Sequence, residues 1–130
     1  MPGAVALLQE LRRHGVKIGI VTNNLLEEQK DKLAACGLSG LVDALVTSEE
    51  FACTKPDPQI FGIALDLVGC TRAEAVMVGD SWEADIVGAR NAGIRAVWFN
   101  RFGAAQPPGE PVEEISSLEP AELVARTLLK

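Results

Sequence analysis

Hydrophobic residues follow two spacings along the chain, one typical of amphipathic helices and the other of buried strands. From Gly3 to His14 apolar residues recur every three or four positions, and Gly15 follows where a C-terminal glycine cap belongs. The next segment, Val16–Val21, is rich in β-branched residues and predicts a strand. Helix and strand patterns therefore alternate from the start of the chain.

The alternation continues to the end of the chain. Short apolar runs predict three further strands, at Ala44–Thr47, Ala75–Val78 and Arg95–Phe99. The intervening helical patterns run from Leu25 to Gly37, from Ile60 to Val68, from Ile86 to Arg90 and from Leu118 to Leu128, the last introduced by Ser116 or Ser117. About four strands separated by helices predict a three-layer, Rossmann-like α/β fold, with a mostly parallel sheet and helices on both faces.

Polar residues follow three of the predicted strands. Thr22 and Asn23 end the first strand, a loop after the second leads to Lys55, and Gly79-Asp80 ends the third. Ligands of open parallel sheets bind beyond the carboxyl ends of the strands. We therefore expect these side chains to share one ligand-binding edge.

Thr22 suits two roles. At the junction of a strand and a helix its hydroxyl can bind a phosphate oxygen, with the backbone N–H groups of Asn23 and Asn24 as further donors. The same hydroxyl can instead cap the helix, because threonine is common at that position. Spacing alone favours the cap.

Lys55 and two aspartates suit an anion and a metal ion. Pro56 and Pro58 restrict the backbone around Lys55, whose ammonium group could neutralise a phosphate, although an exposed loop lysine without function is equally compatible. Asp80 and Asp85 lie at the start of a predicted helix, where their oxygens could hold Mg²⁺. Carboxylates in a first helical turn also stabilise the helix dipole, so Asp85 is the weaker candidate.

Composition narrows the class of protein. The chain has 130 residues, 48% of them hydrophobic, which predicts one soluble domain over residues 1–130. Its net charge of −6 argues against nucleic acid or an anionic membrane as partner. Cys36, Cys53 and Cys70 form no Cys-x-x-Cys pair, which is typical of reduced thiols in the cytoplasm, and no apolar run suits export or a membrane span.

Three motifs, taken in order along the chain, indicate a protein family more specifically than any single residue does. Ile20–Asn23, Lys55–Phe61 and Val78–Ile86 resemble the second, third and fourth motifs of the haloacid dehalogenase (HAD) superfamily. The surrounding segments resemble its phosphoglycolate-phosphatase-like branch, namely Pro2-Gly3, Gly88–Gly93 and Ile115–Leu118. The resemblance covers essentially the whole chain and predicts a HAD-like core.

The resemblance implies Mg²⁺-dependent hydrolysis of a small phosphorylated metabolite. Thr22, Lys55 and Asp80 would form the catalytic set. Thr22 and Lys55 would bind the phosphoryl group together with Asn23, which would act mainly through its backbone. Asp80 would coordinate Mg²⁺, with Asp85 assisting or orienting. Phosphoryl transfer requires mainly positioning and neutralisation of charge, which these groups supply.

The first motif of the family is absent from these 130 residues. In the family that motif is an Asp-x-Asp pair after an N-terminal strand, and its first aspartate is the nucleophile. None of the six aspartates here has a second aspartate two positions on. The helical cap between the first two motifs is absent as well. Two functions therefore stay open, a phosphatase and a catalytically inactive HAD-like domain that binds a partner or dimerises.

In the family the absent strand lies between the strand that ends at Thr22 and the strand that ends at Asp80. Without it, backbone hydrogen-bonding groups would be left unpaired in the core. We expect either that these two strands pair directly or that a second copy of the chain covers the opening in a homodimer. Trp82 could line the ligand pocket or cover this opening.

Overall fold

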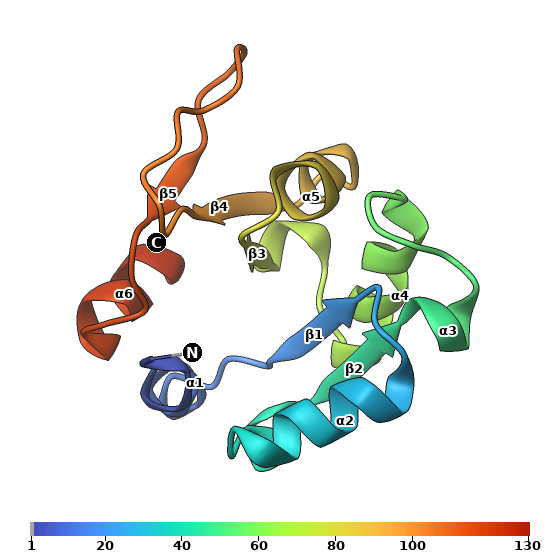
Figure 1. Cartoon of the computed structure of the whole chain (residues 1–130). Helices are drawn as coiled ribbons and strands as arrows, with labels where there is room; N and C mark the ends of the chain where they lie inside the picture. The colour runs from blue at the N-terminus through green and yellow to red at the C-terminus, as the bar shows by residue number, and fades with distance from the viewer. Residues whose placement is uncertain (1) are drawn as a thin grey trace.

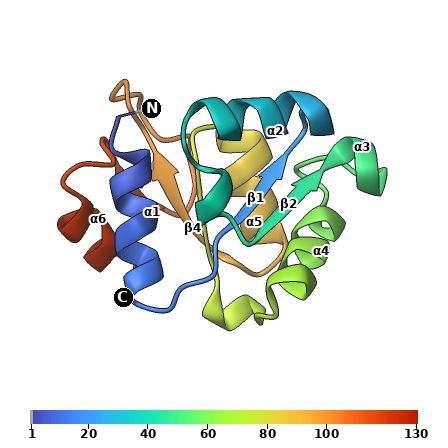
Figure 2. The same cartoon turned by 90° about the horizontal axis from the view of Figure 1, so that it is seen from below.

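The computed structural model describes residues 2–130, which contain five strands in two parallel sheets. In the first sheet, β1 (Gly19–Thr22) pairs with β2 (Ala44–Thr47). In the second, β4 (Arg95–Phe99) lies between β3 (Val76–Gly79) and β5 (Glu113–Ile115). Helices cover both sides of the strands (Figures 1 and 2), which confirms the predicted α/β class.

The helical elements are α1 (Ala4–Arg13), α2 (Leu26–Ala35), α3 (Ser48–Phe51), α4 (Pro58–Val68), α5 (Gly88–Asn91) and α6 (Ala121–Leu128), with 3-10 turns η1 (Ser39–Leu41) and η2 (Arg72–Glu74) and a π-helical segment η3 (Trp82–Val87) that runs into α5. None of the helices in residues 2–130 has the length and apolar character needed to cross a membrane.

Several boundaries differ from the expected ones. The first strand begins at Gly19 because the Ile18 N–H is bound by a side chain rather than by a neighbouring strand. The last helix begins at Ala121, not at Ser116 or Ser117, because the preceding residues form β5 and the connection to α6. Periodicity did not indicate β5, since it is short and two of its three residues are exposed.

Strand β4 separates two hydrophobic clusters. Val97 and Phe99 face α1 and α6, whereas Ala96 and Trp98 face α4 and α5. This alternation is that of a strand with both faces buried. The first cluster also contains Leu7, Leu11, Ile18, Leu118, Val124 and Leu128, and the second contains Val46, Ile60, Phe61, Ile86 and Ala89. The layered arrangement predicted from the sequence is therefore present.

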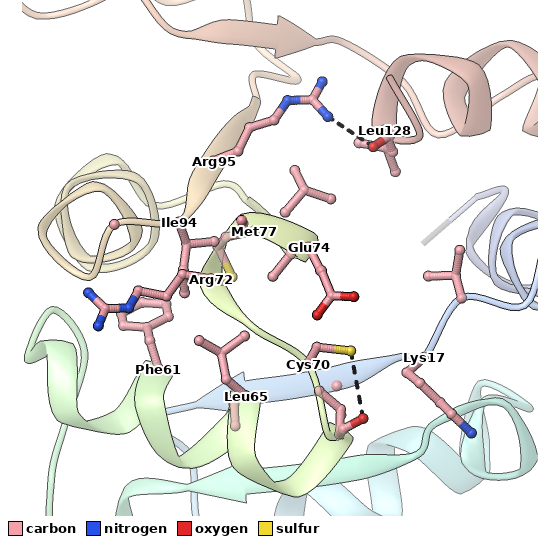
Figure 3. Close-up of a pocket in the computed structure, with 18 of the residues that line it drawn as sticks. Lys17, Phe61, Leu65, Cys70, Arg72, Glu74, Met77, Ile94, Arg95 and Leu128 are labelled. Atoms are coloured by element: carbon pink, nitrogen blue, oxygen red, sulfur yellow. Dashed lines mark hydrogen bonds between the residues drawn. The ribbon is translucent and has the colours of Figure 1, made fainter.

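The expected direct pairing of the strands that end at Thr22 and before Asp80 is wrong. Strands β1 and β3 belong to different sheets. Helix α4 packs against β1 and β2 and also against α5, and so contacts the parts of the molecule that contain the two sheets. Between them lies a groove of about 530 Å³ whose lining includes Val21, Leu65 and Met77 (Figure 3). The facing edges of β1 and β3 thus have no strand neighbour within residues 2–130.

Gly88 allows the two parts of the molecule to approach closely. A Cβ atom at this position would lie 2.8 Å from Cε2 of Phe61 in α4 and 3.1 Å from the Cα of Pro56. Real Cβ atoms do not come this near to an aromatic ring or to backbone without displacing it. The first turn of α5 therefore requires glycine where it meets α4 and the loop of Pro56.

Gly88→Ala is expected to lower the free energy of unfolding by about 1–3 kcal/mol, because overpacking forces backbone shifts. Urea denaturation measures this change. Gly62→Ala is the control, since a Cβ at this position in α4 meets no atom within 4 Å. That variant should keep the wild-type stability or gain up to about 1 kcal/mol from helix propensity. Wild-type stability of Gly88→Ala would contradict the close contact.

Asp43 joins α1 to the beginnings of β1 and β2. Its Oδ2 accepts the Ile18 N–H at 2.7 Å, and the Arg12 guanidinium lies 3.1 Å from both carboxylate oxygens. The backbone N–H of Asp43 donates to the Ile18 carbonyl at 2.7 Å. The Ile18 hydrogen bond, and after it the Arg12 side chain, hold the pKa of Asp43 below its ordinary value.

The pKa of Asp43 is lower in the folded state than in the unfolded chain, where it is about 3.9. Ionised Asp43 therefore stabilises the fold at pH values above the unfolded-state pKa, and this contribution disappears as the pH falls below it. Asp43→Asn should therefore be less stable than wild type at pH 7, and the difference should shrink toward pH 3. Urea denaturation of both proteins across this range measures it. A difference that does not change with pH would show that the charge of Asp43 is unimportant.

Candidate active site

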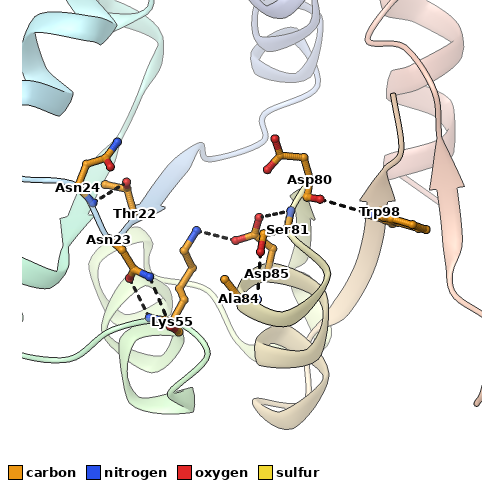
Figure 4. A network of polar contacts seen from close by, with 9 residues as sticks. All are labelled: Thr22, Asn23, Asn24, Lys55, Asp80, Ser81, Ala84, Asp85 and Trp98. Atoms are coloured by element: carbon orange, nitrogen blue, oxygen red, sulfur yellow. Dashed lines mark hydrogen bonds and ion pairs between the residues drawn. The ribbon is translucent and has the colours of Figure 1, made fainter. Parts of the chain in front are cut away.

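The predicted site residues lie at the carboxyl ends of β1 and β3. Thr22 ends β1, Asp80 follows β3, and Lys55 lies in the loop between α3 and α4. Lys55 extends across the space between the two sheets and its Nζ donates to Asp85 Oδ1 at 2.5 Å (Figure 4). The side chains of Lys55 and Asp85 are only 13% and 6% exposed. The structure thus brings together a buried ion pair from opposite parts of the molecule.

Asp85 is held by the turn that precedes it. Its second carboxylate oxygen, Oδ2, accepts the Ser81 N–H at 3.2 Å, and Ser81 Oγ accepts the Ala84 N–H at 3.3 Å. The carboxylate fills the space where a side chain on Gly79 would lie. Because a buried carboxylate without partners is costly, this location requires glycine at 79, the Ser81 turn and Lys55 together.

Asp80 has an exposed carboxylate and a fixed backbone. Its carbonyl accepts the indole N–H of Trp98 at 3.1 Å. Trp82 packs edge-on against Trp98, with ring centroids 5.0 Å apart. The residues that line the groove between the sheets do not include Trp82. Sequence reasoning missed the bond from Trp98, although the register that pairs Gly79 with Trp98 would have indicated it.

The helix-capping role that spacing favoured for Thr22 is wrong, because the N-cap of α2 is Leu25 and no side chain bonds there. Thr22 instead lies at the end of β1, before the turn that leads to the helix. Its Oγ1 accepts the Asn24 N–H at 3.1 Å. Helix α2 begins two residues later, at Leu26, so the expected pair of free N–H groups on Asn23 and Asn24 is reduced to that of Asn23. Within residues 2–130 the Thr22 hydroxyl accepts this hydrogen bond and donates none.

Asn23 uses its side chain as well as its backbone. The Lys55 N–H donates to Asn23 Oδ1 at 2.9 Å, and Asn23 Nδ2 donates to the Lys55 carbonyl at 3.4 Å. The Asn23 carbonyl accepts the Ser48 hydroxyl at 3.1 Å. The loop that carries Lys55 is therefore attached to the end of β1.

The two carboxylates predicted to bind Mg²⁺ differ in their exposure and in the hydrogen bonds that their oxygens accept. No group of three or more His, Cys, Asp or Glu side chains within residues 2–130 is arranged to hold a metal ion. Mg²⁺ is commonly bound by one or two carboxylates, with water and phosphate oxygens completing the shell. The exposed carboxylate of Asp80 fits such a ligand, whereas both oxygens of Asp85 already accept hydrogen bonds. Asp85 fits the role of an assisting neighbour.

Comparison with known proteins gives one consistent group of relatives. Residues 1–99 match the family described as haloacid dehalogenase-like hydrolase. The chain is 42% identical over 124 residues to the pyrimidine 5'-nucleotidase YjjG of Escherichia coli, covering 94% of this chain and 55% of that protein. It is also 42% identical over 100 residues to a phosphoserine phosphatase of Thermus thermophilus, covering 77% and 40%. The chain thus spans about half the length of the curated relatives it matches.

Solved structures agree with these relatives. A HAD phosphatase from Thermococcus onnurineus superposes with a TM-score of 0.84 at 36% identity, covering 95% of this chain and 57% of that one. A 2-haloacid dehalogenase from Pseudomonas syringae superposes with a TM-score of 0.84 at 30% identity, covering 98% and 54%. The fold is therefore shared over nearly the whole of this chain.

Gly79→Ala is expected to displace the Asp85 carboxylate and to lower the free energy of unfolding by about 2–4 kcal/mol, because the buried ion pair loses its geometry. Urea denaturation measures the change. The control is Gly19→Ala, also in a strand, where a Cβ would make an ordinary 3.5 Å contact with Val68. The control should stay within about 1 kcal/mol of wild type. Equal effects of the two substitutions would refute the special role of Gly79.

Proposed function

The chain belongs to the haloacid dehalogenase-like hydrolase family, and on this basis we propose that it is the phosphate-binding core of a Mg²⁺-dependent phosphatase for a small phosphorylated metabolite. Relatives named as phosphatases and a nucleotidase support this class of reaction. Residues 1–130 would form one core domain without a cap. Three cysteines, none of them paired, support a cytoplasmic location.

The buried ion pair of Lys55 and Asp85 is the observation that carries the proposal. Removing a lysine and an aspartate from water costs several kcal/mol per ion, and only good geometry recovers it. The pair lies at the carboxyl ends of parallel strands, the usual ligand-binding edge of such sheets. A positive charge held there, near the hydroxyl of Thr22, suits a phosphoryl group.

Each assigned residue has a defined task. The Thr22 hydroxyl and the Asn23 backbone N–H would donate to phosphoryl oxygens, and the Lys55 ammonium would neutralise their charge. Asp80, assisted by Asp85, would hold Mg²⁺. The ion when bound would neutralise further phosphoryl charge. The roles assigned to these residues are limited to binding and orienting the phosphoryl group. No nucleophile is assigned, because the Asp-x-Asp motif that carries it in the family is not among the 130 residues.

A second candidate function is a catalytically inactive HAD-like domain that binds a partner or dimerises. The facing edges of β1 and β3, which have no strand neighbour in the described part of the chain, favour it. A second copy of the chain that covers the groove would form a homodimer. Nucleic acid and membrane surfaces remain unsuited as partners because the net charge is −6.

The test combines binding and turnover. Calorimetry with orthophosphate, with and without Mg²⁺, should show Mg²⁺-dependent binding by wild type, loss of that dependence in Asp80→Asn, and binding weaker by about tenfold or more in Lys55→Ala, because a charge-assisted hydrogen bond is lost. Asp66→Asn removes the same charge from α4 and serves as the control. Equal binding by wild type, Asp80→Asn and Lys55→Ala would rule out the assigned site.

Hydrolysis of an aryl phosphate by the same proteins separates the two functions. Turnover by wild type that disappears in Asp80→Asn would mean that a replacement nucleophile exists, to be sought at Asp57, at Glu83 or in a second copy. Mg²⁺-dependent binding of orthophosphate without turnover would favour the binding domain. Sedimentation of the same samples would report whether the homodimer forms.

A further inference from the structure

One side chain binds both the N–H and the carbonyl of Lys55. Lys55 lies in the irregular loop between α3 and α4. Within residues 2–130 neither its N–H nor its carbonyl bonds to another backbone group, and both are bound by the amide of Asn23. The N–H bond to Oδ1 is 2.9 Å and the carbonyl bond to Nδ2 is 3.4 Å. The two bonds form a clamp on the Lys55 peptide groups.

Asn23 is itself fixed in place. It directly follows Thr22, the last residue of β1, and its carbonyl accepts the Ser48 hydroxyl from the start of α3. The end of β1, the start of α3 and the Lys55 loop therefore meet at Asn23, and Figure 4 shows the contacts between Asn23 and Lys55. This arrangement sets the location of Lys55 relative to Thr22.

The other contacts of the Lys55 loop come from the second part of the molecule. Lys55 Nζ donates to Asp85 in η3, and Pro56 lies against Gly88 at the start of α5. The loop is thus held between the end of β1 and the helix that follows β3. Asp85 fixes the direction of the ammonium group, and the hydrogen bond from the Asp57 N–H to the Thr54 carbonyl closes the turn around Lys55. Within residues 2–130, Asn23 alone bonds to the N–H and carbonyl of Lys55 itself.

We propose that Asn23 is a positioning residue whose side-chain amide holds the Lys55 backbone, so that the ammonium group faces the same ligand as the Thr22 hydroxyl. The inference deepens the proposed function and rests on it for the identity of the ligand, an orthophosphate or phosphoryl group. The amide is committed to Lys55, which leaves the backbone N–H of Asn23 for that ligand.

The effect of removing the clamp should be local. Asn23 is exposed, so water can replace its amide at the Lys55 N–H and carbonyl, and the fold should persist. The Lys55 loop would then sample more positions, and the ammonium group would spend less time where the ligand binds. The clamp is therefore expected to change anion affinity more than stability.

The first experiment observes Lys55 in the absence of ligand, by NMR of the backbone amide and the side-chain ammonium in ¹⁵N-labelled protein. In Asn23→Ala the Lys55 amide should exchange with solvent about threefold to tenfold faster, because it loses its acceptor. Asn23→Asp retains an acceptor for that N–H and should retain the slower exchange. The control, Asn91→Ala in α5, should match wild type.

The second experiment titrates the same variants with inorganic phosphate in a calorimeter. Asn23→Ala should bind orthophosphate about threefold to tenfold more weakly, corresponding to the loss of one ordinary hydrogen bond in placing the lysine. Asn91→Ala should bind as wild type does. Unchanged affinity of Asn23→Ala beside a measurable wild-type affinity would overturn the positioning role.

The two experiments separate the clamp from the function. If wild type binds no orthophosphate, the proposed function fails, and the Lys55 amide and ammonium signals still decide whether Asn23 holds the lysine. Wild-type exchange of the Lys55 amide together with an unshifted ammonium signal in Asn23→Ala would overturn the clamp whatever the phosphate result. Faster exchange in Asn23→Ala and slow exchange in Asn23→Asp would support it.

Discussion

Lys55 and Asp85 approach each other from opposite parts of the molecule, and in the contact that they form Asp85 is buried and Lys55 is largely buried. A buried charge is stable only with its partner in place, so breaking such a pair typically costs about 3–5 kcal/mol. The loop after α3 and the turn after β3 therefore depend on each other. Glycine at 79 makes room for the carboxylate, and glycine at 88 lets Pro56 come near enough for Lys55 to reach it.

Because the strands are separated into two sheets, the Lys55–Asp85 ion pair contributes more to holding the two parts of the molecule together. Strands β1 and β3 share no ladder, and the two parts are joined by α4, by the Lys55 loop, and by α1, which packs against α6 and bonds to Asp43. The groove between the sheets is mostly apolar, and the strand edges that face it have no strand neighbour within residues 2–130. An ionic contact at one end and helix packing at the other thus replace the continuous hydrogen bonding of an ordinary parallel sheet.

The sequence predicted the parts of the fold that depend on local patterns. Strands β1 to β4 are apolar runs, and Thr22, Lys55 and Asp80 follow strands as polar residues, so pattern and resemblance located them. The split into two sheets lies between the strands that end at Thr22 and before Asp80, where the absence of the family's first strand predicted an opening. The way α4 packs against both parts is encoded by no local pattern. The bonds between Asn23 and Lys55 join residues 32 positions apart through an irregular loop, and chain spacing carries no signal for them.

The tryptophan pair gives the candidate site a spectroscopic signal. Trp82 and Trp98 are the only tryptophans of the chain, which contains no tyrosine. Their rings are 5.0 Å apart and inclined by 74°, and one of them is bonded to the carbonyl of Asp80. The tryptophan contributions to the fluorescence and to the near-ultraviolet dichroism therefore originate beside this one aspartate. A change in structure at the end of β3 can therefore be followed by the tryptophan fluorescence of the unmodified chain.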